Sequence, residues 1–498
     1  MLGATTFDEK QRDINLSASQ LVIPDFYNIS NRVGEAGVYE NFSQFRKNGA
    51  FADLTVGYKD YLFLHGTFRN DWDSRLDKSS RSYSYPSGDI AFVFTDAIPS
   101  LKNNNFLSYG KLRGALGKTG NVSVGPYSLD NVFNSAPNFP YGSTAGFTVS
   151  NALNNRLLKP EITTEKEIGL DLGFFKNKVT AKIAVYQSNT INQTLPVQVS
   201  SATGFSSALL NSGEMQNRGI EVDLNVTVIN NTTRGGLRWD LGGNFSYNDN
   251  KVLSLYPGIN DFLLTGAADQ YVVKGAAFPQ IKLSDWKRDT QKRIIVDKNS
   301  GFPTPNDSLS TYGTSNPPYK LGLSTSVSYK GFTLSVLAEG RFGAVIYNSI
   351  GNALDFTGVS AYSAQMDRTR FVIPNSSYND GTGKYIANAD IAVKNGNNDF
   401  WASTWNGVGS TYLNSADFWK IREVSFSYNF PRNLFKSGSV FKAISVALVA
   451  RNVITFRAKE NVWTDPEFSN TTGNAIGTTD INQNPPTRTF GANVNFTF

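Results

Sequence analysis

The feature that most constrains the fold of this chain is a strict alternation of apolar and polar residues, repeated in many separate segments. It is clearest in segment 167–174, where every even position is apolar and every odd position is polar or glycine. The same pattern recurs in 220–228, 321–329 and 423–430. Successive side chains of a β-strand point to opposite faces, so a period of two gives each strand one apolar and one polar face. The pattern therefore predicts an all-β protein, with carboxylates on the polar face at Asp171, Glu221 and Asp223.

The lengths of the connections between these strands distinguish a membrane barrel from a soluble β-sandwich, whose strands also alternate apolar and polar residues. Short turns are expected at Lys59-Asp60, 176–178 and Lys330-Gly331. Long Asn-, Ser-, Gly- and Pro-rich segments are expected at 119–160, 190–216, 249–275, 343–415 and 454–486. Short periplasmic turns and long extracellular loops are typical of outer-membrane barrels, whereas several loops longer than ~15 residues are unusual in a compact soluble domain. The sequence thus predicts an antiparallel transmembrane β-barrel.

Composition is compatible with this interpretation. Only 18% of the residues are charged, glycine and aromatic residues are abundant, and the mean hydropathy is -0.30. No stretch of ~18 apolar residues occurs, but a transmembrane strand needs only ~9–11 residues, half of which face a polar interior. The absence of cysteine excludes disulfides and thiolate metal sites within this sequence. No run of Lys and Arg indicates a nucleic-acid partner.

We expect about fourteen strands in one domain spanning 1–498, with a final strand as a possible fifteenth. Their expected centres are 41, 54, 65, 92, 113, 170, 183, 223, 242, 281, 324, 336, 424, 447 and 493. The last strand carries apolar residues at Phe490, Val494, Phe496 and Phe498. A terminal Phe on an alternating strand resembles the C-terminal signal through which insertion machinery recognises barrel proteins.

Several segments resemble the SusC/RagA branch of the TonB-dependent transporters. Segment 158–171 is similar to the family's "LKPE–T–EIG–D" motif, and 211–221 to its "N-x-G-x-x-x-N-x-G-x-E" run. Further similarities occur at 285–289, 451–452 and 465–467, in the family's order along nearly the whole chain.

The resemblance implies an outer-membrane barrel of about 22 strands with a plugged lumen. Such proteins import glycans or peptides, with a SusD-like surface lipoprotein closing the outer mouth, TonB supplying energy, and barrels often working in pairs. This chain matches only the C-terminal part of the family, without the signal peptide, TonB box and plug domain. About fifteen strands would leave unpaired edges, and each unpaired backbone group in lipid costs several kcal/mol. We therefore expect either that Met1 is not the biological start or that another chain supplies the remaining strands.

No catalytic group, cofactor site or metal site is indicated. His65 is the only histidine, and without a second His or any Cys it is a poor ligand or triad candidate, so we expect a structural role facing the lumen. Glu221 and Asp223 share a strand face as glycosidase carboxylates do, but carboxylates are expected in any polar lumen.

Aromatic residues in the long loops are the candidates for contact with a ligand or partner, because sugars stack on aromatic faces. These residues are Trp401, Trp405, Tyr412 and Trp463. The alternative is that they pack the loops together or against the lipoprotein.

Three functions follow from these observations. The first is import of glycans or peptides through a SusCD-type transporter. The second is a SusC-like barrel that serves as a structural subunit of a larger outer-membrane assembly. The third is a soluble carbohydrate-binding β-protein, which the loop pattern disfavours.

Overall fold

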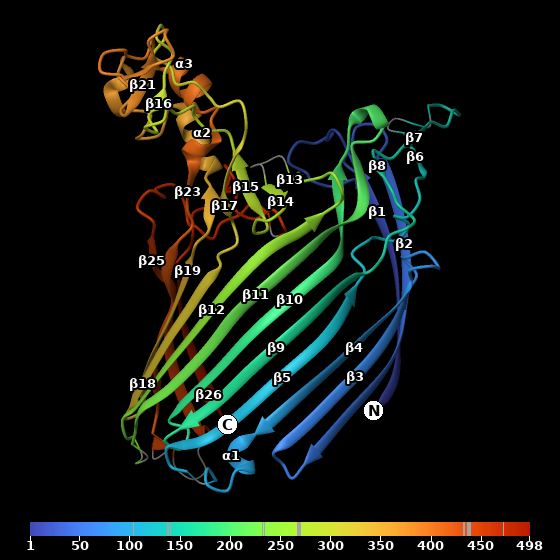
Figure 1. Cartoon of the computed structure of the whole chain (residues 1–498), viewed down its shortest axis with the longest axis vertical. Helices are drawn as coiled ribbons and strands as arrows, with labels where there is room; N and C mark the ends of the chain where they lie inside the picture. The colour runs from blue at the N-terminus through green and yellow to red at the C-terminus, as the bar shows by residue number, and fades with distance from the viewer. Residues whose placement is uncertain are drawn as a thin grey trace.

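Fourteen long strands form one antiparallel sheet that curves into part of a barrel wall (Figure 1). The computed structural model describes residues 1–498 except 103, 137, 138, 140, 232, 234, 266–269, 432, 433, 436–439 and 472. In order across the sheet the strands are β1 (Leu2–Ser17), β2 (Gly37–Tyr58), β3 (Leu62–Asp73), β4 (Ser82–Val93), β5 (Leu107–Asn121), β9 (Glu161–Phe174), β10 (Val179–Gln198), β11 (Ser207–Asn230), β12 (Arg238–Leu255), β18 (Tyr319–Tyr329), β19 (Phe332–Phe342), β24 (Phe418–Asn429), β25 (Ala443–Arg457) and β26 (Thr489–Thr497).

The structure confirms the barrel fold but corrects three strand predictions. The strands expected near 41 and 54 are one continuous strand, β2. The first strand, β1, was not predicted, because segment 2–17 is too polar in its second half to show a period of two. The strand expected near 281 is β15 (Gln280–Leu283), which belongs to a small separate sheet.

The register separates the two faces of the wall as the alternation predicted. Val56, Leu64 and Ile90 are direct neighbours on three adjacent strands, and their exposed fractions are 52%, 48% and 46%. The same row continues through Ile168 and Val185, which are also exposed. Such a row of exposed aliphatic side chains is the lipid-facing surface of a transmembrane barrel.

The opposite face carries charged residues that pair across strands. Asp171 lies beside Lys111 and Lys182, and the Lys111 ammonium is 2.7 Å from its carboxylate. Lys182 in turn lies opposite Asp223 on β11. Asp171, Glu221 and Asp223 are therefore on the inner, polar face, as expected from the sequence.

Short turns gather at one end of the sheet and long connections at the other (Figure 1). The three predicted tight turns are present, and their residues adopt positive φ angles, including Lys59 and Asp60 (48° and 58°) and Lys330 and Gly331 (49° and 89°). One predicted loop is wrong: most of 190–216 belongs to the extended outer ends of β10 and β11. By the asymmetry of outer-membrane barrels, the end with the long connections is the extracellular one.

The long connections carry their own small elements. The strands among them are β6 (Phe133–Ser135), β7 (Phe147–Val149), β8 (Ala152–Leu153), β13 (Asp261–Thr265), β14 (Gln270–Val273), β15 (Gln280–Leu283), β16 (Ile294–Ile295), β17 (Ser310–Thr314), β20 (Val345–Tyr347), β21 (Ser376–Asn379), β22 (Tyr385–Ala387) and β23 (Leu413–Ser415). The helices among them are α2 (Ser349–Thr357) and α3 (Asn398–Phe400), and short 3₁₀ or π turns occupy Ser201–Thr203, Gln365–Arg368, Trp401–Trp405 and Gly409–Tyr412. Helix α1 (Phe94–Ala97) lies instead between β4 and β5, at the end with the short turns (Figure 1).

Two of these connections, 256–318 and 343–417, fold together above the wall into a compact outer unit (Figure 1). Its apolar core contains Val296, Ile373, Val393 and Phe400. In the described part of the chain, no helix has the length and apolar character needed to cross a membrane.

Candidate functional site

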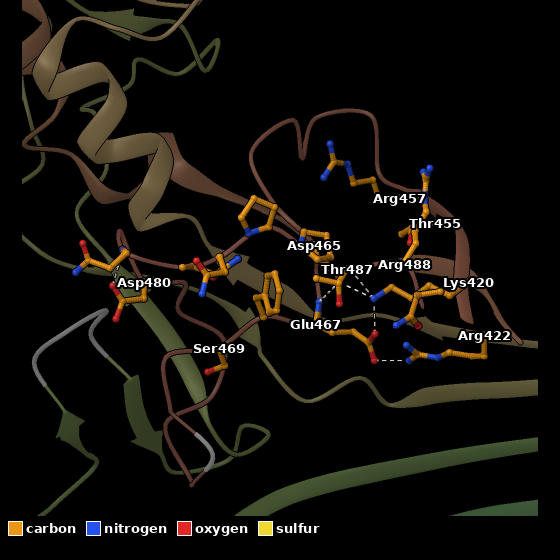
Figure 2. Close-up of a pocket in the computed structure, with 17 residues that line it drawn as sticks. Lys420, Arg422, Thr455, Arg457, Asp465, Glu467, Ser469, Asp480, Thr487 and Arg488 are labelled. Atoms are coloured by element: carbon orange, nitrogen blue, oxygen red, sulfur yellow. Dashed lines mark hydrogen bonds and ion pairs between the residues drawn. The ribbon is translucent and has the colours of Figure 1, made fainter. Parts of the chain in front are cut away.

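A cluster of three cations and three carboxylates ties the inner face of the wall to segment 458–488, which follows β25. Its members are Glu339 and Arg341 on β19, Lys420 and Arg422 on β24, and Asp465 and Glu467 on that segment. The Lys420 ammonium lies 2.6 Å from Asp465 and also contacts Glu467, as Figure 2 shows. Arg422 donates to Glu339 at 2.7 Å and to Glu467 at 2.5 Å. Every charge in the cluster has an opposite partner.

A break in the strand register lies in the part of β24 that carries the cations of the cluster. The pairing of β24 with β19 shifts between Leu337 and Ala338, and its pairing with β25 shifts between Ile421 and Glu423. An extra residue in a strand re-aims the side chains around it. Lys420 and Arg422 already share the inner face by alternation. The extra residue brings Glu423 to this face as well, since Glu423 pairs with Leu337 and Lys420 with Glu339, two positions of β19 on the same face.

Because Lys420 is buried, the ion pairs of the cluster are important for the stability of the fold. Lys420 is only 4% exposed, and a buried ammonium is tolerated only when it is paired and hydrogen-bonded. Burial acts to raise the pKa of Glu467, but hydrogen bonds from Arg422 and Lys420 outweigh it and lower that pKa to about 2. Segment 458–488 is therefore anchored against the wall through charges that persist over the physiological pH range.

The anchored segment and the wall enclose a cavity of about 1190 Å³ at the outer end of the lumen. Besides members of the cluster, its lining includes Arg457, Arg488, Asp480 and several amide side chains, among them Asn452. In Figure 2, Asp480 lies on the side of the view opposite Lys420 and Arg422. The cavity lining includes Lys420 and Arg422, which lie on the inner face of the wall.

Three of the loop aromatics predicted to contact a ligand or partner lie in the outer unit, and the fourth, Trp463, lies in segment 458–488. Trp405, Tyr412 and Trp463 line one pocket of about 360 Å³, whereas Trp401 packs in the apolar core and is 6% exposed. Trp405 stacks on both Trp286 and Phe400, at ring-centroid distances of 5.4 and 5.5 Å, so its ring is already engaged by other aromatic side chains.

Tyr412 is fully buried and donates a 3.0 Å hydrogen bond to Asp355 on α2. Burial raises the pKa of the Asp355 carboxyl, while hydrogen bonds from Ser360 and Tyr412 partly oppose the increase. These contacts agree with the alternative in which the aromatics pack the loops together. Contact between these aromatics and a ligand or partner stays a prediction.

His65 and the C-terminal strand lie where the sequence placed them. The two ring nitrogens of His65 are 2.7 Å from Asp89 and 3.1 Å from Asp53, on the inner face of β3. No group of three or more potential metal ligands was found among the described residues. Along the last strand the side chains are exposed, by 72% at Phe490, 50% at Val494, 50% at Phe496 and 66% at Phe498. Recognition of these residues by insertion machinery stays a prediction.

Sequence reasoning did not find Lys420, Arg422, Arg457 and Arg488 as site residues. The motif at 465–467 indicates only a family similarity in the sequence and does not show which residues hold it. The available signal was the run Lys420-Ile421-Arg422-Glu423, which places three charges in four residues of an otherwise alternating strand. Such a run marks a bulge, but its partners on β19 and on segment 458–488 depend on tertiary structure.

Comparisons with known proteins agree with this architecture. Residues 5–355 match the family model "TonB dependent receptor-like, beta-barrel". A TonB-dependent receptor of Formosa agariphila is 26% identical over 476 residues, which cover 86% of this chain and 44% of the relative. The TonB-dependent receptor SusC of Bacteroides thetaiotaomicron is 24% identical over 426 residues, covering 82% of this chain and 40% of SusC.

Among solved structures, the RagAB peptide transporter superposes with a TM-score of 0.79 at 18% identity, covering all of this chain and 53% of the matched one. The chain thus spans about half the length of the relatives it matches. The family match extends over most of the chain, and the fold, the faces of the wall and the loop asymmetry are those of a transmembrane barrel. The chain therefore belongs to the TonB-dependent receptor family, on its SusC/RagA branch, and forms part of the β-barrel of a bacterial outer-membrane protein.

Proposed function

We propose that the protein imports glycans or peptides across the outer membrane, as the SusC-like barrel of a SusCD-type transporter. The observation that carries the proposal is the anchored segment 458–488, which folds back against the polar inner wall and forms a large polar cavity at the outer end of the lumen. A wall that only held an assembly together would not need such a cavity on its inner face. Import proceeds by gated passage, and this chain makes or breaks no bond.

Two partners belong to this proposal. A SusD-like surface lipoprotein closes over the outer unit, and TonB supplies energy through an N-terminal region of the native protein. The names of the similar proteins support import, since one is the TonB-dependent receptor SusC and another is the RagAB peptide transporter. Pairing of two such complexes is a further expectation from the family.

The test is deletion of the gene in its native host, followed by growth on defined glycans and peptides as sole nutrient sources. We expect lost or slowed growth on one class of polymer, and co-purification of the barrel with a SusD-like lipoprotein. Unchanged growth on every substrate, together with co-purification in a large complex without such a lipoprotein, would instead establish the structural-subunit role.

A further inference from the structure

The charges around the luminal cavity are unevenly compensated. Its lining contains four cations and three carboxylates. The cations are Lys420, Arg422, Arg457 and Arg488, and the carboxylates are Asp465, Glu467 and Asp480. Asp465 and Glu467 are already engaged by Lys420 and Arg422. Asp480 accepts a hydrogen bond from the backbone N–H of Asn482, which fixes it in its own turn. Among the described residues, Arg457, Arg488 and Asp480 have no ion-pair partner, and the lining keeps a net charge of +1.

Arg457 is held in place without being neutralised. Its guanidinium donates to the backbone carbonyl of Thr464 at 2.7 Å and to that of Val462 at 3.4 Å. Both carbonyls belong to the segment that Asp465 and Glu467 anchor to the wall. The ion cluster thus fixes the backbone that orients Arg457, and a preorganised cation binds an anion at a lower entropic cost.

Arg488 brings a second positive charge to the same cavity, just before β26. Within the described residues, neither Arg457 nor Arg488 forms an ion pair with a carboxylate. A guanidinium fork matches a carboxylate geometrically and can bind it through two parallel hydrogen bonds. The remaining lining residues include Asn452, Asn482 and Asn484, whose amides can both donate and accept hydrogen bonds from a polar chain.

We propose that this cavity is a substrate subsite selective for a carboxylate group, which the guanidinium groups of Arg457 and Arg488 bind. The inference rests on the proposed import function and adds to it the charge of the substrate. The carboxylate belongs either to an acidic oligosaccharide or to an acidic peptide. Both sources present the same group to the same two arginines, so the experiment has to distinguish them.

The test measures binding by isothermal titration calorimetry to the native polypeptide, purified in detergent from outer membranes. The probes are trigalacturonate and triglutamate, with maltotriose and triglycine as their neutral counterparts. We expect at least one acidic probe to bind more tightly than its neutral counterpart. In the double variant Arg457→Gln/Arg488→Gln, that binding should weaken by about tenfold or more, as expected for the loss of charge-assisted hydrogen bonds. Preference for trigalacturonate identifies a glycan as the source, and preference for triglutamate identifies a peptide.

Arg451→Gln is the matched control. It removes one positive charge from the same strand, but Arg451 is paired with Glu423 at 2.9 Å and does not line the cavity. Its affinity for the acidic probe should stay within about twofold of wild type. An unchanged heat-modifiable mobility of all variants on gels shows that each barrel is folded.

Two results would overturn the inference: acidic probes that bind no better than neutral ones, or acidic probes that bind the double variant as tightly as wild type. Neither result affects the proposed function if growth on a neutral glycan or peptide still requires the gene. Conversely, growth that never requires the gene contradicts the import function, whatever the binding data show.

Discussion

At the scale of single residues, Lys420 is the most consequential side chain of the luminal cluster. It is buried and meets two carboxylates at once, so its removal would leave Asp465 and Glu467 without their shared cation. We expect Lys420→Met to destabilise the protein by about 3–5 kcal/mol, the usual cost of removing one partner of a buried ion pair. Urea unfolding in detergent measures the change.

A suitable comparison is Arg12→Gln. Arg12 pairs with Glu40, and both side chains are at least half exposed. Exposed pairs contribute about 0–1 kcal/mol, so this variant should unfold close to wild type. A Lys420→Met protein as stable as the Arg12→Gln protein would show that the cluster does not anchor segment 458–488.

Because the pKa of Glu467 is low, its contribution to the stability of the fold depends on pH, and the sign of that dependence is defined. Its folded pKa is about 2, whereas an unfolded glutamate titrates near 4.3. A carboxylate with a lowered pKa stabilises the fold fully above its unfolded pKa, and this contribution disappears as pH falls through the folded pKa. The stability difference between wild type and Glu467→Gln should therefore be constant above about pH 5 and shrink progressively toward pH 2.

Urea unfolding midpoints of wild type and Glu467→Gln at pH 7, 5, 3.5 and 2 provide the measurement. As the pH falls, both proteins lose their other carboxylate interactions to the same extent. Only the difference between their unfolding midpoints therefore reports on Glu467. A difference that stays the same down to pH 2 would mean that Glu467 is not held as a carboxylate by Lys420 and Arg422.

At the scale of elements, the tight turns fix the register of the wall. In the hairpin of β18 and β19, Lys330 and Gly331 adopt left-handed conformations, and a Cβ on Gly331 would lie 2.7 Å from the carbonyl oxygen of Asn429. Only glycine adopts this conformation without a steric cost. The turn therefore sets both the pairing of its own hairpin and the approach of β24.

We expect Gly331→Val to destabilise the barrel by about 1–2 kcal/mol or more, because it adds a left-handed valine and a backbone clash. The control is Gly491→Ala on β26, where an added Cβ would meet no atom within 4 Å. The resistance of each folded barrel to heating in detergent, followed by gel mobility, compares the two. Equal resistance of both variants would contradict a structural role for this turn.

At the scale of the whole molecule, the two outermost strands, β1 and β26, constrain how the barrel wall is completed. Among the described residues, β1 pairs only with β2 in the main sheet, and β26 pairs only with β25. Lipid offers no hydrogen-bonding partner to a strand edge, so in the membrane further strands must pair with both. We expect these strands to come from the same polypeptide, since the matched relatives are about twice as long.

The denatured intact mass of the native polypeptide from isolated outer membranes tests this expectation. A mass well above 54.6 kDa, with an N-terminal sequence upstream of Met1, is the expected result. A mass of 54.6 kDa from a barrel that co-purifies with a second strand-forming chain would show that the partner closes the wall.

What the sequence determined by itself is the identity of the two faces and the position of the tight turns. Alternation is a local property: it assigns Asp171 and Asp223 to one face and Ile168 to the other, whichever strand becomes the neighbour. The turn at Lys330-Gly331 is equally local, because it depends on the φ angles that two adjacent residues can adopt. Local signals of this kind were sufficient to predict an outer-membrane barrel with long loops at one end.

Tertiary structure alone decided which residues form the cavity and how the outer loops fold. Lys420 and Glu467 are separated by 47 positions in the sequence and meet only because segment 458–488 turns back against the wall. Trp405 looks like an exposed sugar-stacking residue in the sequence, yet Trp286, from a different connection, covers one of its faces. Both outcomes depend on contacts between distant segments, whose pairing is set by the folded arrangement of the whole chain and leaves no local pattern in the sequence.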